Sequence, residues 1–286
     1  MADDETAAGR LARLRPVLRF TLIACVVLYV GYLAVLFTLQ RQMLFPGTRI
    51  VPEVGVAPPG ERSERVWIEI EGGARVEAWF LPAPDATAST PAPAVILTHG
   101  NGELIDYWGD GVRPYHRMGL SVLLPEYRGY GRSGGAPSKE GLTADAIRFR
   151  GWLVARPEVD ADRIVYHGFS LGGGVAGAVA AAHPPRAMIL QSTFTRIADM
   201  TSIPVPAFLI ADPFDTASVV READYPILVV HGTEDGLIPY RQGVRLSELA
   251  RDGRLVTHGG GHQLMPDQAA FWREVRAHLR RASVVR

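Results

Sequence analysis

The feature that most constrains the fold is a series of short apolar segments that alternate with helical stretches from residue 94 onward. The segments are almost continuously hydrophobic, which is typical of strands buried on both faces. The alternation predicts a mostly parallel sheet with helices on both faces. The predicted strands are residues 94–98, 121–125, 163–167, 187–191, 227–231 and 254–257. The predicted helices are residues 103–118, 139–155, 171–182, 240–251 and 267–281.

A hairpin is predicted before this alternating region. Residues 66–70 and 76–80 are two apolar runs, and Gly72-Gly73 lies between them. Such runs around a glycine pair are typical of antiparallel strands joined by a turn. Together with the later segments, the hairpin predicts a sheet of about eight strands. Ligands of such sheets bind beyond the carboxyl ends of the parallel strands, so the residues that follow each strand are the candidates for chemistry.

The N-terminal region contains a predicted membrane segment. Residues 20–39 carry no charged side chain and are rich in Leu, Val, Ile, Phe and Tyr. A helix of this length, rising about 1.5 Å per residue, spans the ~30 Å hydrocarbon core of a bilayer. The more basic flank is expected to stay in the cytoplasm, which places the C-terminal part on the extracytoplasmic side. The arginines before and after the segment are Arg10, Arg13, Arg15, Arg19, Arg41 and Arg49.

Two other interpretations of this stretch are weaker. A signal peptide has an apolar core of about 7–15 residues and a small-x-small cleavage site, whereas this stretch is longer and ends in Phe37-Thr38-Leu39. A core helix of a soluble protein would show a polar face. We therefore predict an uncleaved, single-pass anchor. The predicted organisation is a basic cytoplasmic segment 1–19, the anchor 20–39, a linker 40–65 and an α/β domain 66–286.

Composition excludes several classes of protein. Among 286 residues, Lys and Arg together number 30 and Asp and Glu together number 30, so the formal net charge is zero. A nucleic-acid-binding protein with a dominant basic surface is therefore not expected. Cys25 is the single cysteine, which excludes an intramolecular disulfide and a cysteine-based metal cluster. No metal site or cofactor is predicted, and the sequence does not indicate an oligomeric state.

A candidate nucleophile follows the predicted strand 163–167. Residues 168–172 read Gly-Phe-Ser-Leu-Gly, which places Ser170 in a G-x-S-x-G motif between a strand and a helix. Glycines on both sides allow a sharp turn that exposes the serine hydroxyl. The bare motif occurs by chance in glycine-rich chains, and its position between strand and helix is what supports the prediction.

An acid and a histidine follow two later strands. Asp235 lies just after strand 227–231, where a carboxylate can orient a histidine and stabilise its charged form. Glu234 is the adjacent alternative. His262 lies in a Gly-rich loop after strand 254–257, and it is preferred over His258, which abuts the strand. The order serine, acid, histidine along the chain is that of the α/β-hydrolases.

The turn after strand 94–98 is a candidate oxyanion site. It reads His99-Gly100-Asn101, and a Gly-rich turn at this place can aim a backbone N–H at a developing negative charge. The predicted donors are the backbone N–H groups of Asn101 and Leu171. His99 is interpreted as a structural residue that ties the loop down by hydrogen bonds.

Taken together, these motifs resemble the α/β-hydrolase superfamily of serine hydrolases and, more narrowly, its Bem46-like group. The resemblance covers roughly residues 65–280 and implies an α/β-hydrolase fold behind one transmembrane helix, with Ser170, Asp235 and His262 as the catalytic triad. One departure is Glu103, since members often carry a small residue, Gly and Asn after His-Gly-Asn. The matching motifs are residues 99–101, 126–138, 168–172, 192–200, 231–235 and 260–262.

The function predicted from these residues is a membrane-anchored serine hydrolase of carboxylic esters or thioesters that forms an acyl-enzyme and needs no cofactor. Its expected partners are a small-molecule or lipid acyl substrate and the membrane, without nucleic acid. A serine peptidase or amidase of the same fold is one alternative, and a non-catalytic binding scaffold is another. The physiological substrate and its acyl-chain length cannot be read from the sequence.

Two further segments have open interpretations. The loop 128–138 contains arginines that could contact an anionic substrate, although a structural role in shaping the site is favoured. The segment 203–210 is apolar and interrupted by prolines. It is predicted to line an acyl pocket, to touch the bilayer or to pack into the core.

Overall fold

The computed structural model describes residues 2–201, 203–263 and 266–286. In this part of the chain the sheet has eight strands in the order β1-β2-β4-β3-β5-β6-β7-β8. β1 and β2 form an antiparallel hairpin at one edge, β2 pairs antiparallel with β4, and all other pairs are parallel. The strands are β1 Glu64–Glu69, β2 Arg75–Leu81, β3 Ala92–Thr98, β4 Ser121–Pro125, β5 Val159–Phe169, β6 Ala187–Gln191, β7 Ile227–Gly232 and β8 Gly253–His258.

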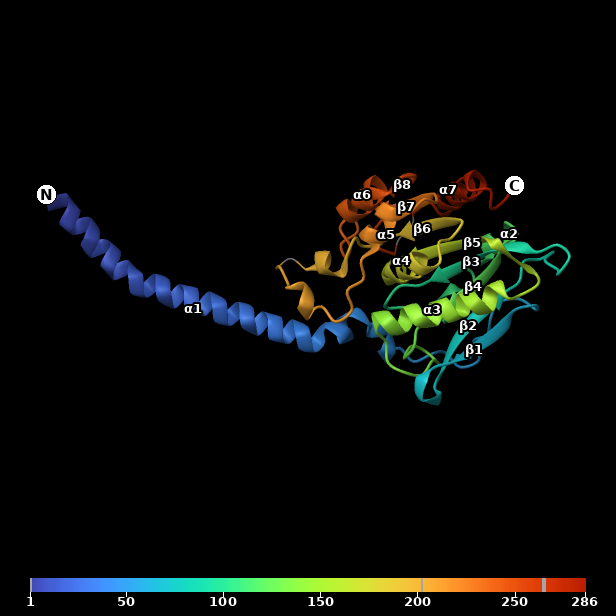
Figure 1. Ribbon diagram of the computed structural model, residues 1–286, viewed down its shortest axis with the longest axis horizontal. Helices are drawn as coiled ribbons and strands as arrows, with labels where there is room; N and C mark the ends of the chain where they lie inside the picture. Colours follow the sequence, from blue (N-terminus) through green and yellow to red (C-terminus); the bar gives the residue numbers. More distant parts are fainter. Residues whose placement is uncertain (1, 202, 264–265) are drawn as a thin grey trace.

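Helices cover both faces of the sheet, as the alternating sequence predicts (Figure 1). Apolar side chains of α3, α4, α5 and α6 pack with one set of strand residues, and those of α2 and α7 pack with the other set. Along β3, for example, Ile96 points to the first layer and Leu97 to the second, as expected for a strand buried on both faces. The helices are α1 Ala2–Leu44, α2 Arg113–Arg117, α3 Lys139–Val154, α4 Leu171–Ala182, α5 Thr216–Glu222, α6 Tyr240–Leu249 and α7 Gln268–Arg281.

The predicted α/β architecture, a mostly parallel sheet of about eight strands with helices on both faces, is therefore confirmed. The predicted helix 103–118 is wrong as a single element: it consists of a short 3-10 helix, Ile105–Trp108, and then α2. Gly109 and Gly111 separate the two pieces, and glycine disfavours a continuous helix. Helix α5 was not predicted, because it is only seven residues long and follows an irregular segment.

Helix α1 extends away from the α/β domain (Figure 1). Within the described residues it is the one helix long and apolar enough to span a membrane, judged by length and composition, and the qualifying stretch is Leu14–Leu44. It contains the predicted anchor 20–39. The helix thus continues five residues into the segment 40–65 that the sequence predicts to be a linker.

The first part of that segment packs onto the α/β domain. Phe45 is buried, and a 3-10 helix follows at Pro46–Arg49. The backbone N–H of Gly47 donates to the carbonyl of Asn101 at 3.0 Å. The amide side chain of Asn101 donates in turn to the carbonyl of Leu44, also at 3.0 Å. These contacts fix the C-terminal end of α1 beside the loop that follows β3.

The other end of the chain also packs onto the domain. Val284 is fully buried in the layer formed by α2 and α7. Arg163 donates to the carbonyl of Val284 at 3.2 Å, and Arg186 donates to that of Ala282 at 2.8 Å. The last residues thus complete one of the two helical layers.

Candidate active site

Ser170 lies in the tight turn between β5 and α4. Its backbone has φ 54° and ψ −118°, a conformation that residues with a side chain rarely adopt. The turn depends on the glycines around it, because a Cβ at Gly172 would overlap the carbonyl oxygen of Thr98 and one at Gly168 would overlap Gly172 and Gly173. Such strain is stored at functional sites, where it exposes a reactive group.

Of the three residues predicted as a triad, His262 lies within hydrogen-bonding distance of both Ser170 and Asp235. Nε2 of His262 is 2.9 Å from Oγ of Ser170, and Nδ1 of His262 is 2.8 Å from Oδ2 of Asp235. The Asp235 side chain is fully buried, whereas the His262 side chain is 14% exposed. A substrate can therefore reach the histidine and the serine while the carboxylate stays shielded from water.

The position of Asp235 is fixed by the turn after β7. Its Oδ1 accepts hydrogen bonds from the backbone N–H groups of Leu237 and Ile238, at 2.9 and 2.8 Å. This leaves Oδ2 to face His262. The adjacent Glu234 is exposed to solvent, and His258 accepts a hydrogen bond from the N–H of Gly260 at the end of β8. Neither of these alternative residues belongs to the hydrogen-bonded chain.

The predicted oxyanion donors lie next to the serine. Asn101 and Leu171 line one pocket together with Ser170. Leu171 is the first residue of α4, where a backbone N–H has no intrahelical acceptor. Within the described part of the chain, the backbone N–H of Asn101 has no acceptor either. Both donors are therefore available to a ligand.

Glu103, the departure from the family pattern, holds the loop that carries Asn101. Its Oε2 accepts from the backbone N–H of Gly100 at 2.9 Å and from the indole of Trp108 at 3.1 Å. The carboxylate is thus engaged by two donors. The role found for Glu103 is to shape the turn.

His99 is a structural residue, as its position in the motif suggests. Its Nε2 lies 2.9 Å from Oε1 of Glu126 and its Nδ1 lies 2.8 Å from the carbonyl of Gly100, and the whole side chain is buried. Burial opposes protonation, but the carboxylates of Glu126 and Glu103 outweigh it and raise the pKa of His99 above its ordinary value.

The arginines of the loop 128–138 serve the structure of that loop. Arg128 makes two hydrogen bonds of 2.7 Å with the carboxylate of Asp145 on α3. Arg132 donates to Glu77 at 2.7 Å and to Asp106 at 2.9 Å. Because these guanidinium groups are already paired, the structural interpretation of the loop is favoured over binding of an anionic substrate.

An apolar pocket of about 280 Å³ opens at Ser170. Its lining contains no charged side chain. The sequence did not predict that α1 contributes to it. The signal that could have indicated this is spacing, since Leu36, Gln40 and Met43 recur at helical intervals on one face. The lining residues are Leu36, Gln40, Met43, Leu44, Asn101, Ser170, Leu171, Phe194, Ile197, Met200, Thr201, Leu237 and Ile238.

A second pocket, of about 450 Å³, is lined in part by Phe169 and Gln263, which are next to Ser170 and His262 in the sequence. It is lined by Phe169, Trp108, Phe271 and Trp272 among others. The ring of Phe169 is 5.3 Å from that of His262. The second pocket is therefore close to the candidate triad, although none of the three residues lines it.

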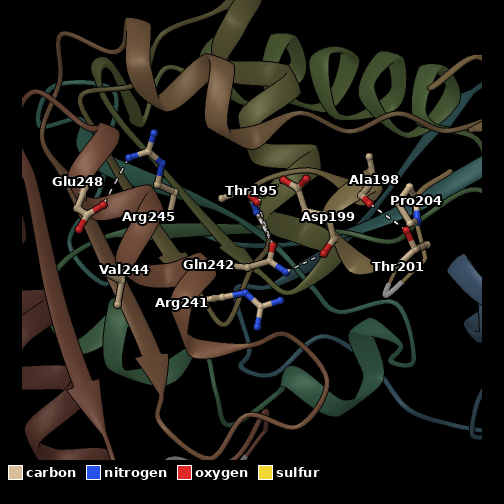
Figure 2. A pocket seen from close by; sticks show the side chains of 10 residues that line it. All are labelled: Thr195, Ala198, Asp199, Thr201, Pro204, Arg241, Gln242, Val244, Arg245 and Glu248. Carbon is tan, nitrogen blue, oxygen red and sulfur yellow. Dashed lines mark hydrogen bonds and ion pairs between the residues drawn. The ribbon is translucent and has the colours of Figure 1, made fainter. Parts of the chain in front are cut away.

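Another cavity, of about 630 Å³, has several charged side chains in its lining and does not include Ser170 (Figure 2). Gln242 lies at its centre and accepts from the backbone N–H of Thr195 at 3.0 Å. Arg241 and Arg245 line its rim. Among the residues that the structure describes, no group of three or more His, Cys, Asp or Glu side chains is arranged to hold a metal ion.

Comparisons with known proteins agree with the fold. A family model for the alpha/beta hydrolase fold matches residues 93–217, and one for serine hydrolases (FSH1) matches residues 164–275. An uncharacterised protein of Mycobacterium tuberculosis is 33% identical over 239 residues, which cover 81% of this chain and 83% of that protein. Protein bem46 of Schizosaccharomyces pombe is 26% identical over 260 residues, covering 85% of each chain.

A solved structure is similar in fold. The thermophilic esterase Est2 of the planctomycete Thermogutta terrifontis, with butyrate bound, superimposes with a TM-score of 0.64 at 16% identity, covering 78% of this chain and 95% of that one. The chain belongs to the α/β-hydrolase family. Within that family it is a serine hydrolase that resembles Bem46.

Proposed function

We propose that the protein is a membrane-anchored serine hydrolase that cleaves carboxylic esters or thioesters with Ser170, His262 and Asp235 as its triad. The observation that carries the proposal is the chain of two hydrogen bonds, 2.9 Å from His262 to Ser170 and 2.8 Å from His262 to Asp235. A nucleophile next to a base that is oriented by a third group has the arrangement needed to activate a hydroxyl at neutral pH.

In the acylation step, Oγ of Ser170 attacks the carbonyl carbon while Nε2 of His262 accepts the hydroxyl proton. Asp235 holds the imidazole by accepting from Nδ1 and stabilises its positive charge. The negative charge on the carbonyl oxygen is stabilised by the backbone N–H groups of Asn101 and Leu171. Each such donor is worth roughly 10²–10³ in turnover. His262 then gives its proton to the departing alcohol or thiol.

Deacylation repeats these steps with water. His262 takes a proton from a water molecule, the resulting hydroxide attacks the acyl-enzyme, and Ser170 leaves as its hydroxyl after it recovers the proton. The products are a carboxylic acid and a free serine. No step requires a metal ion or an organic cofactor.

The membrane part of the proposal rests on α1. We propose residues 20–39 as the transmembrane anchor, with residues 1–19 in the cytoplasm and the domain 66–286 on the extracytoplasmic side. The supporting observations are the uncharged stretch, its helical conformation and the more basic N-terminal flank. A reporter fused to the C-terminus tests the orientation. Activity of a reporter that works only in the cytoplasm would reverse it.

A fluorophosphonate probe tests the catalytic part. The probe is expected to label wild-type protein covalently and to leave Ser170→Ala unlabelled. Labelling at another residue, or none in the wild type, would support a non-catalytic scaffold. Hydrolysis of p-nitrophenyl acyl esters compared with aminoacyl anilides then separates an esterase from a peptidase or amidase, and we expect the esters to be cleaved faster.

A further inference from the structure

One wall of the apolar pocket at Ser170 belongs to α1 and not to the α/β domain. Leu36 is part of the uncharged stretch 20–39, and Gln40 is the first residue after it. At about 1.5 Å of rise per residue, the α1 residues of the pocket cover about 12 Å of the helix. The pocket therefore begins at the level of the apolar stretch and ends at the nucleophile. The α1 residues that line it are Leu36, Gln40, Met43 and Leu44.

The contact between α1 and the domain is specific. The side chain of Gln40 donates to the carbonyl of Leu209 at 3.0 Å and accepts from the backbone N–H of Ala211 at 2.8 Å. Arg41 pairs with Asp212 at 3.1 Å, and the side chain of Asp212 is 2% exposed. These bonds, with the Asn101–Leu44 hydrogen bond, hold the helix in one position relative to the serine. The pocket wall is thus a fixed part of the site.

The segment 203–210 lies alongside the apolar half of α1 (Figure 1). The hydroxyl of Tyr29 donates to the carbonyl of Pro204 at 2.8 Å. Tyr29 lies eleven residues before Gln40, well inside the uncharged stretch. The segment has no charged residue, and its Ile203 and Phe208 side chains are 47% and 84% exposed. When residues 20–39 are in a bilayer, this apolar segment lies beside α1 at the same leaflet.

We infer that the site takes carboxylic esters whose acyl chain resides in the bilayer, with that chain lying against α1 in the apolar pocket. This inference rests on the proposed function. A volume of about 280 Å³ is at the lower end for ligand pockets, which commonly measure ~300–1,000 Å³. The pocket therefore holds the part of the chain next to the carbonyl, and the rest extends along α1 into the lipid. Water and the ester yield a fatty acid and the alcohol part of the lipid.

The uncharged lining of the pocket favours an acyl chain as its ligand. The pocket lining has no charged residue, so an ionic group would lose its hydration there without compensation. The charged side chains Arg241, Arg245 and Glu248 line the neighbouring cavity of about 630 Å³ and do not line this pocket (Figure 2). An aliphatic chain, in contrast, gains contacts with Leu36, Met43 and their neighbours.

The test uses the full-length protein in phosphatidylcholine vesicles. The quantity measured is kcat/KM for p-nitrophenyl dodecanoate divided by kcat/KM for p-nitrophenyl acetate. Leu36→Trp fills the pocket from the helix side, and we expect it to lower this ratio at least about tenfold relative to wild type. Val35→Trp is the matched control, since Val35 is 58% exposed and outside the pocket lining. In that variant the ratio is expected to stay within about twofold of the wild-type ratio.

A second variant covers the case in which Leu36→Trp does not fold. Leu36→Ala removes contacts with the acyl chain and is expected to lower the ratio about two- to tenfold. Equal ratios in the Leu36 variants, Val35→Trp and wild type would overturn the inference. A wild-type enzyme that prefers acetate would overturn it too. If the fluorophosphonate also fails to label wild-type protein, the proposed function itself is wrong. If labelling is normal, only the inference about the acyl pocket is wrong.

Discussion

Among the described residues, two histidine–carboxylate pairs with nitrogen–oxygen distances below 3 Å lie at the same edge of the sheet, and only one of them contacts Ser170. The His99–Glu126 pair joins residues after β3 and β4, and the His262–Asp235 pair joins residues after β8 and β7. Their nitrogen–oxygen distances are nearly equal, 2.9 and 2.8 Å. The second nitrogen of His99 faces a carbonyl, however, whereas that of His262 faces the Ser170 hydroxyl.

Exposure separates the pairs further. The side chains of His99 and Glu126 are at most 1% exposed, whereas His262 is 14% exposed. The buried pair also ties down the backbone, because Glu126 accepts from the N–H groups of Ile105 and Tyr127 at 3.1 and 2.9 Å. A histidine beside a carboxylate is therefore no sign of catalysis by itself. The group on the other nitrogen and access for a substrate decide its role.

The largest expected effect comes from the matched variants His262→Gln and His99→Gln. We expect His262→Gln to lower kcat on a short-chain p-nitrophenyl ester at least about 10⁴-fold, because the serine loses its base. His99→Gln is expected to lower the melting temperature while kcat changes less than about tenfold, because His99 does not touch the serine. Activity assays and thermal unfolding in detergent measure both. Equal losses of kcat would show that the two pairs are not functionally distinct.

Asp235→Asn, compared with Glu234→Gln, tests the acid. The asparagine cannot stabilise a charged His262 and favours the wrong tautomer, so kcat should fall by roughly 10⁴-fold. Glu234 is exposed, and its variant should retain activity within about twofold and stability within about 0.5 kcal/mol. If Glu234→Gln were the inactive variant, the assignment of the acid would be wrong.

The buried pair is tested by Glu126→Ala. This change leaves His99 without its carboxylate and two backbone N–H groups without an acceptor. Breaking a buried pair from one side costs about 3–5 kcal/mol. Urea unfolding in detergent should therefore show a free energy of unfolding lower by this amount. An unchanged value would mean that water replaces the carboxylate.

The pH dependence of stability distinguishes histidines with opposite shifts. The pKa of His99 is raised in the folded protein. What this histidine adds to the free energy of unfolding is therefore fully present below its unfolded pKa of about 6.5, and it is lost as pH rises through the folded pKa. Burial lowers the pKa of His167 to about 4. What His167 adds to the free energy of unfolding is therefore present above about pH 6.5 and is lost as the pH falls towards 4. This loss amounts to about 3 kcal/mol.

His167→Gln provides the measurement. Between pH 7 and pH 4, wild-type protein should lose about 3 kcal/mol more of its free energy of unfolding than the variant does. His278, whose pKa burial also lowers to about 4, is present in both proteins and cancels in the difference. Parallel pH profiles of wild type and variant would contradict the assigned shift.

The fold was predictable because local patterns determine it. The strands at 121–125 and 187–191 have their predicted bounds, since each is a continuous apolar run with clear ends. The residues proposed as the triad were also found from the sequence, because each lies in the loop or turn after a parallel strand of the sheet. Their roles stay predictions until the variants are measured.

The position of α1 was not predictable in this way. It depends on contacts between distant segments, such as Gln40 with Ala211 and Asn101 with Leu44. A glutamine often follows the apolar stretch of a membrane helix. Its presence at residue 40 does not indicate which part of the domain its side chain contacts. The burial of Phe45 likewise depends on the shape of the domain surface. The sequence therefore indicated the triad candidates but not the wall beside them.

The burial of Val284 has a consequence for truncated forms of the protein. Helix α7 and the residues after it close the second apolar layer of the domain, and they follow His262 in the sequence. A polypeptide shortened before α7 would therefore keep Ser170, Asp235 and His262 but leave one face of the sheet open to water. Because each face of such a sheet must be covered by another layer, we expect this shortened form not to fold.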